Sequence, residues 1–464
     1  MLAVVWHRIK IFYGPTLLNR RVWRLSLPVM LGMSTTTLVM LADTLMVGQL
    51  GAPALAAAGM GGVVFWTVLS FLMGASFGIQ ILTARYFGAR DRLRLGQTLF
   101  SSILLTLLTG ILITLCLWPA APWIVHVLAD GSEFQQQTTD FFLWRLTGLI
   151  SWFLVFGLRA WFDGLGRTET GFIASILIMV TNILGNWLLI FGNLGLPQMG
   201  TNGAALASSL ASLPGLLYLT IMLLRPDFRQ YWQPAWFERV RINAAVLRQM
   251  ILIGSPAAID NLMLNLSFSL FFKLAAEIGT TAVAASNVLI AIFSVAFMPG
   301  FGFGVAATTL LGIRIARQQY RIARAGTLRS ALFASTLMSV IGLFVFWQAP
   351  WVLQLFTDDQ NVIQDALQAV LIMSIVQAAD GWQMTMAMAL RSAGRVMQVL
   401  TIYSLSSILF FLPVSWLLGL YLEMGTMGLW AGFALWLLLL ALIFDQTFAR
   451  LNLKLCSQTL TAAD

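Results

Sequence analysis

Charged and metal-binding side chains are scarce in this 464-residue chain. Only 10% of its residues are Asp, Glu, Lys or Arg, against about 25% in a typical soluble domain. Two cysteines exclude a disulfide-rich secreted fold, and two histidines argue against a zinc enzyme. Because the sequence also has no phosphate-binding loop, nucleophile elbow or cluster of metal ligands, we expect no enzyme.

Apolar residues make up 59% of the chain and give it a mean hydropathy of +0.85. A helix needs about 20 apolar residues to cross a hydrocarbon core of about 30 Å. Twelve such stretches begin near Ser26, Ala54, Thr98, Thr138, Gly171, Asn202, Leu247, Thr281, Ser330, Ala366, Val396 and Met427. Since an open strand edge is not stable in lipid, the sequence predicts an all-α integral membrane protein with twelve transmembrane helices.

Loop charges predict the orientation of these helices. The chain has 27 Lys and Arg residues against 18 Asp and Glu residues, a formal charge of +9. With the N-terminus in the cytoplasm, 25 of the 27 basic residues fall in cytoplasmic segments, and only Arg145 and Lys273 lie inside spans or at their outer ends. The positive charge therefore indicates topology and not nucleic-acid binding. We expect both termini to be cytoplasmic and the protein to lie in a bacterial inner membrane.

The two halves of the chain share a pattern of residues. An ungapped shift of 228 residues aligns Pro28 with Pro256, Gly51 with Gly279, and Gly166-Arg167 with Gly394-Arg395. Six spans in each half give both halves the same polarity, which predicts a pseudo-two-fold axis along the membrane normal and a substrate cleft between the halves. The predicted domains are an N-terminal six-helix lobe (1-224), a cytoplasmic linker (225-248) and a C-terminal six-helix lobe (249-464).

Ionisable residues inside the spans are the strongest functional candidates, because a charge in the hydrocarbon costs at least about 2.5 kcal/mol on insertion scales. Three acids qualify: Asp43 in the first span, Asp260 in the seventh and Asp380 in the tenth. The alternative is a structural role, in which a neutral or hydrogen-bonded carboxyl group holds two helices together.

Amide side chains accompany two of these acids. Asn182 and Asn186 lie four residues apart on one face of the fifth span, and Gln383 lies one turn from Asp380. An amide can hydrogen-bond a carboxyl group in either protonation state or help to bind a cation. The alternative is that these polar groups only join helices, at about 1 kcal/mol or less for each bond.

Aromatic rings are abundant, with 32 Phe and 17 Trp, and their faces can bind a lipophilic cation. Most of them must face lipid or pack inside the protein. The candidates for a substrate cleft come from the second and seventh spans and are Phe65, Trp66, Phe268, Phe271 and Phe272.

Three segments resemble the multidrug and toxic compound extrusion (MATE) family of secondary transporters, and the resemblance covers nearly the whole chain. The first is LPVMLGMSTTTLVMLADTLMVGQLGAPALAA, which begins at Leu27. The second is LRAWFDGLGRTETG with TNILGNWLLIFGNLGLPQMGTNGAALAS, between Leu158 and Ser208, and it is most similar to the NorM-like branch. The third is DGWQMTMAMALRSAGR, which begins at Asp380.

The resemblance implies a secondary antiporter that exports organic cations or amphipathic drugs in exchange for H⁺ or Na⁺ by alternating access. Asp43, Asn182, Asn186 and Asp380 match acidic and polar positions of the family, which implies that they take part in cation coupling. One position differs: the residue eight positions after the proline of the seventh span is commonly Glu in NorM-like members and is Leu264 here.

Asp260 lies one turn before Leu264 on the same helix face. It is therefore either a second cation or substrate contact, together with Gln383, or a polar residue of the cytoplasmic side. We expect Asp43 to be the main coupling group and Asp380 to be a second cation or substrate anchor. The expected partners are the lipid bilayer, the organic substrate and H⁺ or Na⁺, with no cofactor, no bound metal and no nucleic acid, and the expected state is a monomer.

Two other functions are compatible with a membrane protein. A lipid-linked precursor flippase of the wider superfamily tends to have more spans and a basic central cavity, whereas the central charges here are acidic. An intramembrane lipid-modifying enzyme needs metal-binding acids, and the paired acids Asp358 and Asp359 fall in an outer loop.

Overall fold

The computed structural model describes residues 16–129, 134–237 and 242–454, which form helices and connecting turns with no β-strand among them. Eleven helices, some of them made of shorter helices joined end to end, are long and apolar enough to cross a membrane. One further pair, α5 and α6, passes the same test together, bends by 47° at its break, and brings the number to twelve if the pair is counted as one span. The predicted all-α membrane fold is therefore confirmed, and each of the twelve predicted spans lies in one of these helices.

The spans follow one another with short connections. In chain order they are α2 (Leu17–Gly48), α3 (Ala52–Ala89), α4 (Arg92–Ala129), α5 (Gln135–Leu146) with α6 (Leu149–Gly164), α7 (Thr168–Phe191), α8 (Gly200–Leu210) with α9 (Ser212–Leu224), α11 (Ala244–Ile278), α12 (Thr280–Ala316), α13 (Tyr320–Trp347), α15 (Gln360–Ser392), α16 (Val396–Ser406) with η2 (Ser407–Phe411), α17 (Leu412–Trp416) and η3 (Leu417–Tyr421), and α18 (Gly425–Ala449). The connections also contain η1 (Asn193–Gly195), α10 (Pro226–Phe237) and α14 (Ala349–Gln354).

The chain forms two compact units. Of the described residues, those in Met1–Met30 and Ile259–Asp464 form unit 1, and those in Leu31–Ala258 form unit 2. The chain passes from one unit to the other inside α2 and again inside α11. The first described turns of α2 belong to unit 1, because Val22 and Leu25 pack in one apolar cluster with Phe303. The lobe boundaries near residues 224 and 249 stay a prediction from the sequence repeat.

The turns after α6 and α15 have the same backbone geometry. Gly166 and Gly394 have φ values of 75° and 89°, a region that favours glycine because it has no Cβ. Each glycine N–H donates to the carbonyl three residues earlier, that of Asp163 or Arg391, at 3.0 Å. The 228-residue shift aligns these two glycines, so the same helix ending occurs in both halves of the sequence.

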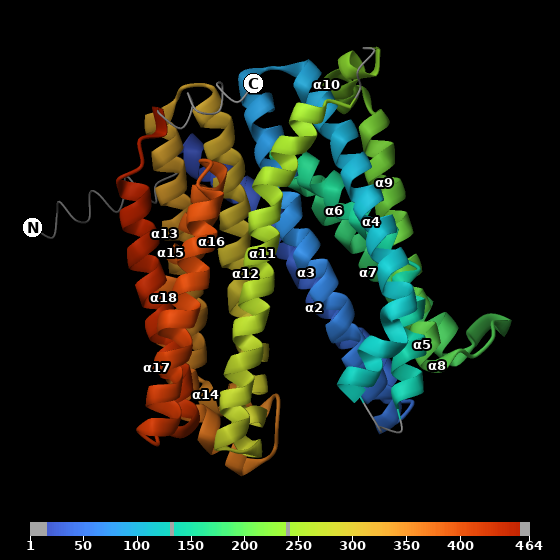
Figure 1. Ribbon diagram of the computed structural model, residues 1–464, viewed down its shortest axis with the longest axis vertical. Coiled ribbons are helices and arrows are strands. Elements are labelled where there is room, and N and C mark those ends of the chain that lie inside the picture. Colours follow the sequence, from blue (N-terminus) through green and yellow to red (C-terminus); the bar gives the residue numbers. More distant parts are fainter. Residues whose placement is uncertain (1–15, 130–133, 238–241, 455–464) are drawn as a thin grey trace, which may run out of the picture. The chain divides into compact units, whose positions relative to one another are not determined.

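Unit 1 is organised around α15, which packs against α12, α13 and α18 (Figure 1). Its core is rich in aromatic rings. Phe411 stacks on Phe271 and on Trp436, with ring centroids 5.5 and 4.9 Å apart, and such pairs contribute about 0.5–1.5 kcal/mol beyond their buried area. These rings join α11, η2 and α18 within the unit.

Unit 2 depends on close helix contacts made possible by glycine. A Cβ at Gly74 or Gly78 of α3 would collide with the backbone of Ala257 or Met250 in α11. Lipid provides no hydrophobic force between membrane helices, and small residues four positions apart allow the close packing that replaces it. The predicted linker 225–248 also contains structure, since α10 packs against α4.

Candidate functional site

The first candidate acid, Asp43, lies in unit 2 and accepts a hydrogen bond from α7. Asn186 Nδ2 donates to Asp43 Oδ1 at 2.5 Å. Asn186 Nδ2 also approaches Asn182 Oδ1 at 3.3 Å, and Asn182 Nδ2 donates to Ser208 Oγ of α8 at 2.9 Å. The structure thus brings together the acid and both amides named from the sequence and adds Ser208 to them.

The helix packing around α7 explains why these polar groups meet. Asn182 and Asn186 are 1% and 0% exposed, one turn apart on the buried face of α7. Small residues bring α8 close to this face, since a Cβ at Gly185 would lie 3.0 Å from the Cβ of Ala207. Ser208 follows Ala207 directly, so the close approach of the two helices places its hydroxyl within reach of Asn182.

A buried basic residue, Arg145, belongs to the same unit as this acid. Arg145 is in the last turn of α5, and its guanidinium carbon lies 4.5 Å from the centroid of the Phe65 ring. Its Nε is buried, and no hydrogen bond or ion pair of the Arg145 side chain occurs among the described residues. In the sequence, Arg145 is one of the two basic residues that do not fall in a predicted cytoplasmic segment.

In unit 1, Asp260 is paired with a cation. Its carboxylate Oδ2 accepts a hydrogen bond from Arg391 Nη2, and the two side chains are only 7% and 12% exposed. The pair joins α11 to the last turn of α15. The Arg391 guanidinium also lies over the ring of Tyr403, 5.7 Å from its centroid. Asp260 is therefore a buried carboxylate whose charge is already balanced within the unit.

Asp380, in contrast, has a neutral hydrogen-bond donor. Gln383 Nε2 donates to Asp380 Oδ1 at 2.9 Å, and the Tyr403 hydroxyl donates to Gln383 Oε1 at 2.6 Å. The predicted contact between Asp380 and Gln383 is thus present within α15. Tyr403 of α16, which was not named from the sequence, continues the chain of hydrogen bonds towards Arg391.

A small cavity in unit 1 lies next to this polar group. Its lining is Asp260, Met263, Leu264, Tyr403, Ser407 and Trp436. Leu264 is the position at which the resemblance leads one to expect Glu, and Asp260 lines the same cavity. A carboxylate is therefore retained beside this space, but it comes from one turn earlier and is bound to Arg391.

The five aromatic residues predicted for a substrate cleft have different surroundings. Phe65 and Phe271 are 1% and 0% exposed, in the cores of unit 2 and unit 1 respectively. Phe268 packs against the core of unit 1, and Phe272 is partly buried. Trp66 is 45% exposed. Inside their own units Phe65 and Phe271 therefore act as packing residues.

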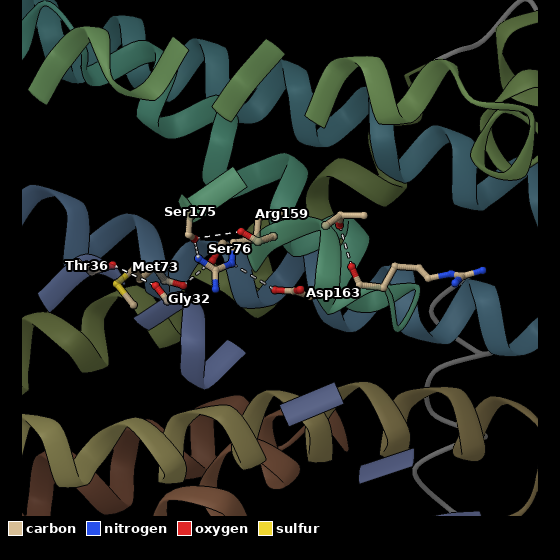
Figure 2. A network of polar contacts seen from close by, with 10 residues as sticks. Gly32, Thr36, Met73, Ser76, Arg159, Asp163 and Ser175 are labelled. Carbon is tan, nitrogen blue, oxygen red and sulfur yellow. Dashed lines mark hydrogen bonds and ion pairs between the residues drawn. The ribbon is translucent and has the colours of Figure 1, made fainter. Parts of the chain in front are cut away.

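Unit 2 contains a second buried charge network, which Figure 2 shows from close by. Arg159 Nε lies 3.8 Å from Asp163 Oδ2, and Arg159 Nη1 donates to Ser175 Oγ at 3.3 Å. A Cβ at Gly32 would lie 3.2 Å from Arg159 Nη2, so the glycine leaves room for the guanidinium. Arg159 was assigned from the sequence to a cytoplasmic segment, but it lies inside α6, because the helix continues beyond the apolar stretch.

The networks of the two units occupy equivalent positions in the duplicated sequence. The 228-residue shift aligns Gly32 with Asp260, Asp163 with Arg391, and Ser175 with Tyr403. In unit 2, Arg159 of the fourth predicted span approaches Gly32 of the first. In unit 1, Arg391 of the tenth predicted span binds Asp260 of the seventh. The charge at one aligned position is opposite in the two units, since Asp163 of unit 2 corresponds to Arg391 of unit 1.

Known proteins resemble the chain over most of its length. The MatE family model matches residues 28–188 and 256–417. A probable multidrug resistance protein NorM of Thermotoga maritima is 27% identical over 424 residues, which are 89% of each chain. A protein of the same description from Idiomarina loihiensis is 23% identical over 440 residues, 92% of this chain and 93% of that one.

A solved structure shares the fold. It is a multidrug resistance MATE family transporter of the MOP superfamily in an outward-facing conformation, with a TM-score of 0.87 and 21% sequence identity. The match covers 95% of this chain and 98% of that one. At this identity the likeness establishes the arrangement of helices.

Proposed function

Because the chain belongs to the MatE family, we propose that it is a secondary active antiporter that exports organic cations or amphipathic drugs in exchange for H⁺ or Na⁺. The resemblance recognised in the sequence motifs is confirmed by this family match and by the relatives named NorM. Those relatives are described as multidrug resistance proteins, which supports drug export by this chain.

The observation that carries the proposal is the bonding of Asp43 within unit 2. A carboxylate inside a membrane helix is costly, and binding H⁺, Na⁺ or an organic cation offsets that cost. Asn186 holds Oδ1 of the carboxylate in place, and Asn182 is fixed in turn by Ser208. Amide and carboxylate oxygens are suitable ligands for a hard cation, and a carboxylate also accepts a proton.

Asp43 is then the main coupling group, assisted by Asn182 and Asn186. Asp380, bonded to the neutral Gln383, is the second cation or substrate anchor. Asp260 already has Arg391 as its partner, so we assign it a positioning role in place of a coupling role. In an alternating-access cycle the coupling ion and the substrate bind these acids in turn, and each releases the other.

The remaining parts of the proposal concern the setting of the protein. The positions of the arginine residues support both termini in the cytoplasm, and the bacterial relatives support a bacterial inner membrane as the location. We propose that the protein works as a monomer without a cofactor. Lipid-linked precursor transport is the alternative, and it calls for a phosphate-bearing substrate.

The experiment that tests the function is transport in proteoliposomes. Purified protein is reconstituted with a fluorescent organic cation, and a Na⁺ gradient and a pH gradient are imposed separately. Export driven by either gradient supports the antiporter and identifies the coupling ion. If neither gradient drives the dye while a lipid-linked phosphate precursor crosses the bilayer, the flippase alternative is correct.

A further inference from the structure

Four arginine side chains of unit 1 carry charges that repel one another. Arg21 and Arg24 lie in the first turns of α2, whereas Arg314 and Arg317 lie at the end of α12. All three of the other charges act on Arg21, and Arg317 also acts on Arg314. Like charges that folding brings together cost free energy unless a counter-charge binds among them. We refer to these four residues as the arginine cluster.

Apolar packing brings the two helix ends together. Val22, which follows Arg21 directly, packs in one apolar cluster with Leu310, which precedes Arg314 by one turn. A Cβ at Gly302 of α12 would lie 3.0 Å from a backbone oxygen of α2, so the two helices are in close contact. The arginine side chains therefore project from a packed framework, which is the condition for a preorganised binding group.

The neighbouring arginines of α13 already have partners. Arg329 Nη1 donates to Thr16 Oγ1 at 2.7 Å and fastens the start of α2 to α13. Arg324 Nη2 donates to the carbonyl oxygens of Phe448 and Ala449, at 3.1 and 2.7 Å, where α18 ends. These two residues thus serve the fold itself, and their position beside the arginine cluster shows what an occupied guanidinium looks like in this region.

Three members of the arginine cluster, in contrast, have unused donors. No hydrogen bond or ion pair of the Arg21 or Arg24 side chain occurs among the described residues. Arg314 Nη1 donates to Gln319 Oε1, but its Nε is buried without a partner. A guanidinium carries five N–H donors in a planar fork, so these side chains can bind an anion without giving up a contact.

The helices that form the cluster contain no acid that could neutralise it. The sequence has no Asp or Glu from residue 1 to 42 or from residue 278 to 357, which includes the first turns of α2 and all of α12 and α13. Asp445 of α18, one turn before the carbonyls that Arg324 binds, accepts a hydrogen bond from Trp382 Nε1 at 3.2 Å. The counter-charge must therefore come from outside these three helices.

The depth of the cluster matches that of lipid phosphates. The apolar stretch of α2 begins near Ser26, and at a rise of 1.5 Å per residue Arg24 and Arg21 lie about 3 and 8 Å before it. The headgroup layer on each side of the hydrocarbon is about 5–8 Å thick. Trp23, which is 37% exposed, lies between them, and Trp is enriched at the membrane–water interface.

We propose that the arginine cluster binds the phosphate of an anionic phospholipid. The phosphate supplies the counter-charge that the three helices lack, and its oxygens match the planar fork of an arginine. Basic pockets between membrane helices bind anionic headgroups in this way. In the topology proposed above the lipid belongs to the cytoplasmic leaflet, and it fastens the first turns of α2 to α12. The inference does not depend on the proposed export function.

A matched pair of lipids tests the proposal. Purified full-length protein in detergent is mixed with dioleoylphosphatidylglycerol, which has a net negative charge, or with dioleoylphosphatidylcholine, which has the same acyl chains and no net charge. Native mass spectrometry gives the ratio of the two lipids retained, and thermal unfolding gives the gain in melting temperature. The variants are Arg21→Gln, Arg21→Glu and the control Arg229→Gln, at an exposed arginine of α10. Inorganic phosphate is added alone to a parallel sample.

The wild type is expected to retain the phosphatidylglycerol over the phosphatidylcholine by about ten-fold, the preference that a charge-assisted hydrogen bond provides. Arg21→Gln should lower this preference to about three-fold or less and should not lower the melting temperature without lipid, because it removes a repelled charge. Arg21→Glu places a carboxylate among the remaining arginines. It should melt highest without lipid and gain least from phosphatidylglycerol, while Arg229→Gln should match the wild type.

Equal retention of the two lipids by the wild type, or an unchanged preference in both Arg21 variants, overturns the proposal. An equal loss in Arg229→Gln also overturns it, because the lipid would then be attracted by the basic surface in general. If inorganic phosphate raises the melting temperature as much as phosphatidylglycerol does, the ligand is a soluble anion and the lipid assignment is wrong. If Arg21→Gln does not fold, Arg24→Gln, at an exposed member of the cluster, decides by the same two readings.

Discussion

Arg391 forms a buried ion pair with Asp260 between α15 and α11, and the same guanidinium lies over the ring of Tyr403. Both partners lie within unit 1, and Asp260 also lines the cavity next to Leu264. Asp43 and Asp380, in contrast, are hydrogen-bonded to the amides of Asn186 and Gln383, and this difference is the reason for the division of roles that we propose among the three acids.

Neutralising both members of this pair should be less harmful than neutralising one. Asp260→Asn leaves the Arg391 charge buried without its carboxylate, and such a loss typically costs about 3–5 kcal/mol. The double variant Asp260→Asn with Arg391→Gln should recover most of the melting temperature and of the transport rate. Thermal unfolding in detergent and dye export in proteoliposomes give the two readings. A double variant that is stable but inactive would instead identify Asp260 as a coupling group.

Asn186→Leu should weaken binding of the coupling ion. The substitution removes the amide that donates to Asp43 Oδ1, and a hydrogen bond to a charged group contributes about 1.5–3 kcal/mol. The concentration of Na⁺ or H⁺ that gives half-maximal export should therefore rise about ten-fold or more. Asn361→Leu, a matched change at an exposed asparagine of α15, serves as the control. If the ion concentration for half-maximal export is unchanged, Asn186 does not take part in ion binding.

Tyr403→Phe should lower transport without unfolding the protein. The hydroxyl donates to Gln383 Oε1 at 2.6 Å, and Gln383 in turn donates to Asp380. Loss of one hydrogen bond of this kind costs about 1 kcal/mol, which corresponds to a few-fold change in substrate or ion affinity. Tyr421→Phe removes the hydroxyl of a tyrosine that is 68% exposed and should have no effect. Equal transport by Tyr403→Phe and Tyr421→Phe would show that the hydrogen bond from Tyr403 to Gln383 does not contribute to the function of Asp380.

Gly78→Leu should destabilise unit 2. A Cβ at Gly78 would lie 3.1 Å from the Gly254 nitrogen and closer still to the Met250 carbonyl, and a helix backbone cannot move away at low cost. Overpacking of this kind costs about 1–3 kcal/mol or more. Gly62→Leu is the control in the same helix, since a Cβ there meets nothing within 4 Å. The melting temperatures of the two variants in detergent check the prediction, and similar values would contradict it.

The sequence predicted the helices well because membrane spans depend on local composition. Each of the twelve apolar stretches lies in one of the eleven long apolar helices or in the bent pair α5 and α6, and the turns at Gly166 and Gly394 follow from a repeat visible in the residues. The contact between Asp43 and Asn186 was also foreseeable, since both are polar residues in apolar spans and match a family pattern. Spacing along one helix, as for Asp380 and Gln383, is likewise a local property.

Pairs between distant helices could not be predicted in this way. Asp260 and Arg391 are 131 residues apart, and Arg391 was counted with the charges of a cytoplasmic segment because it follows an apolar stretch. Arg159 was missed for the same reason. Loop charges and buried charges at a helix end look alike in a sequence. Only the packing of α6 against α7, and of α15 against its neighbours, distinguishes them.

The most direct test of the account is gradient-driven export by Asp43→Asn. Wild-type and variant proteins are reconstituted at equal density, and export of a fluorescent cation is followed after a Na⁺ or pH gradient is imposed. Asn is close to Asp in size but cannot carry the charge that H⁺ or Na⁺ neutralises. The account therefore predicts no gradient-driven export by Asp43→Asn, although the variant is folded and elutes from a size-exclusion column in detergent at the wild-type position. Export by Asp43→Asn at the wild-type rate would contradict it.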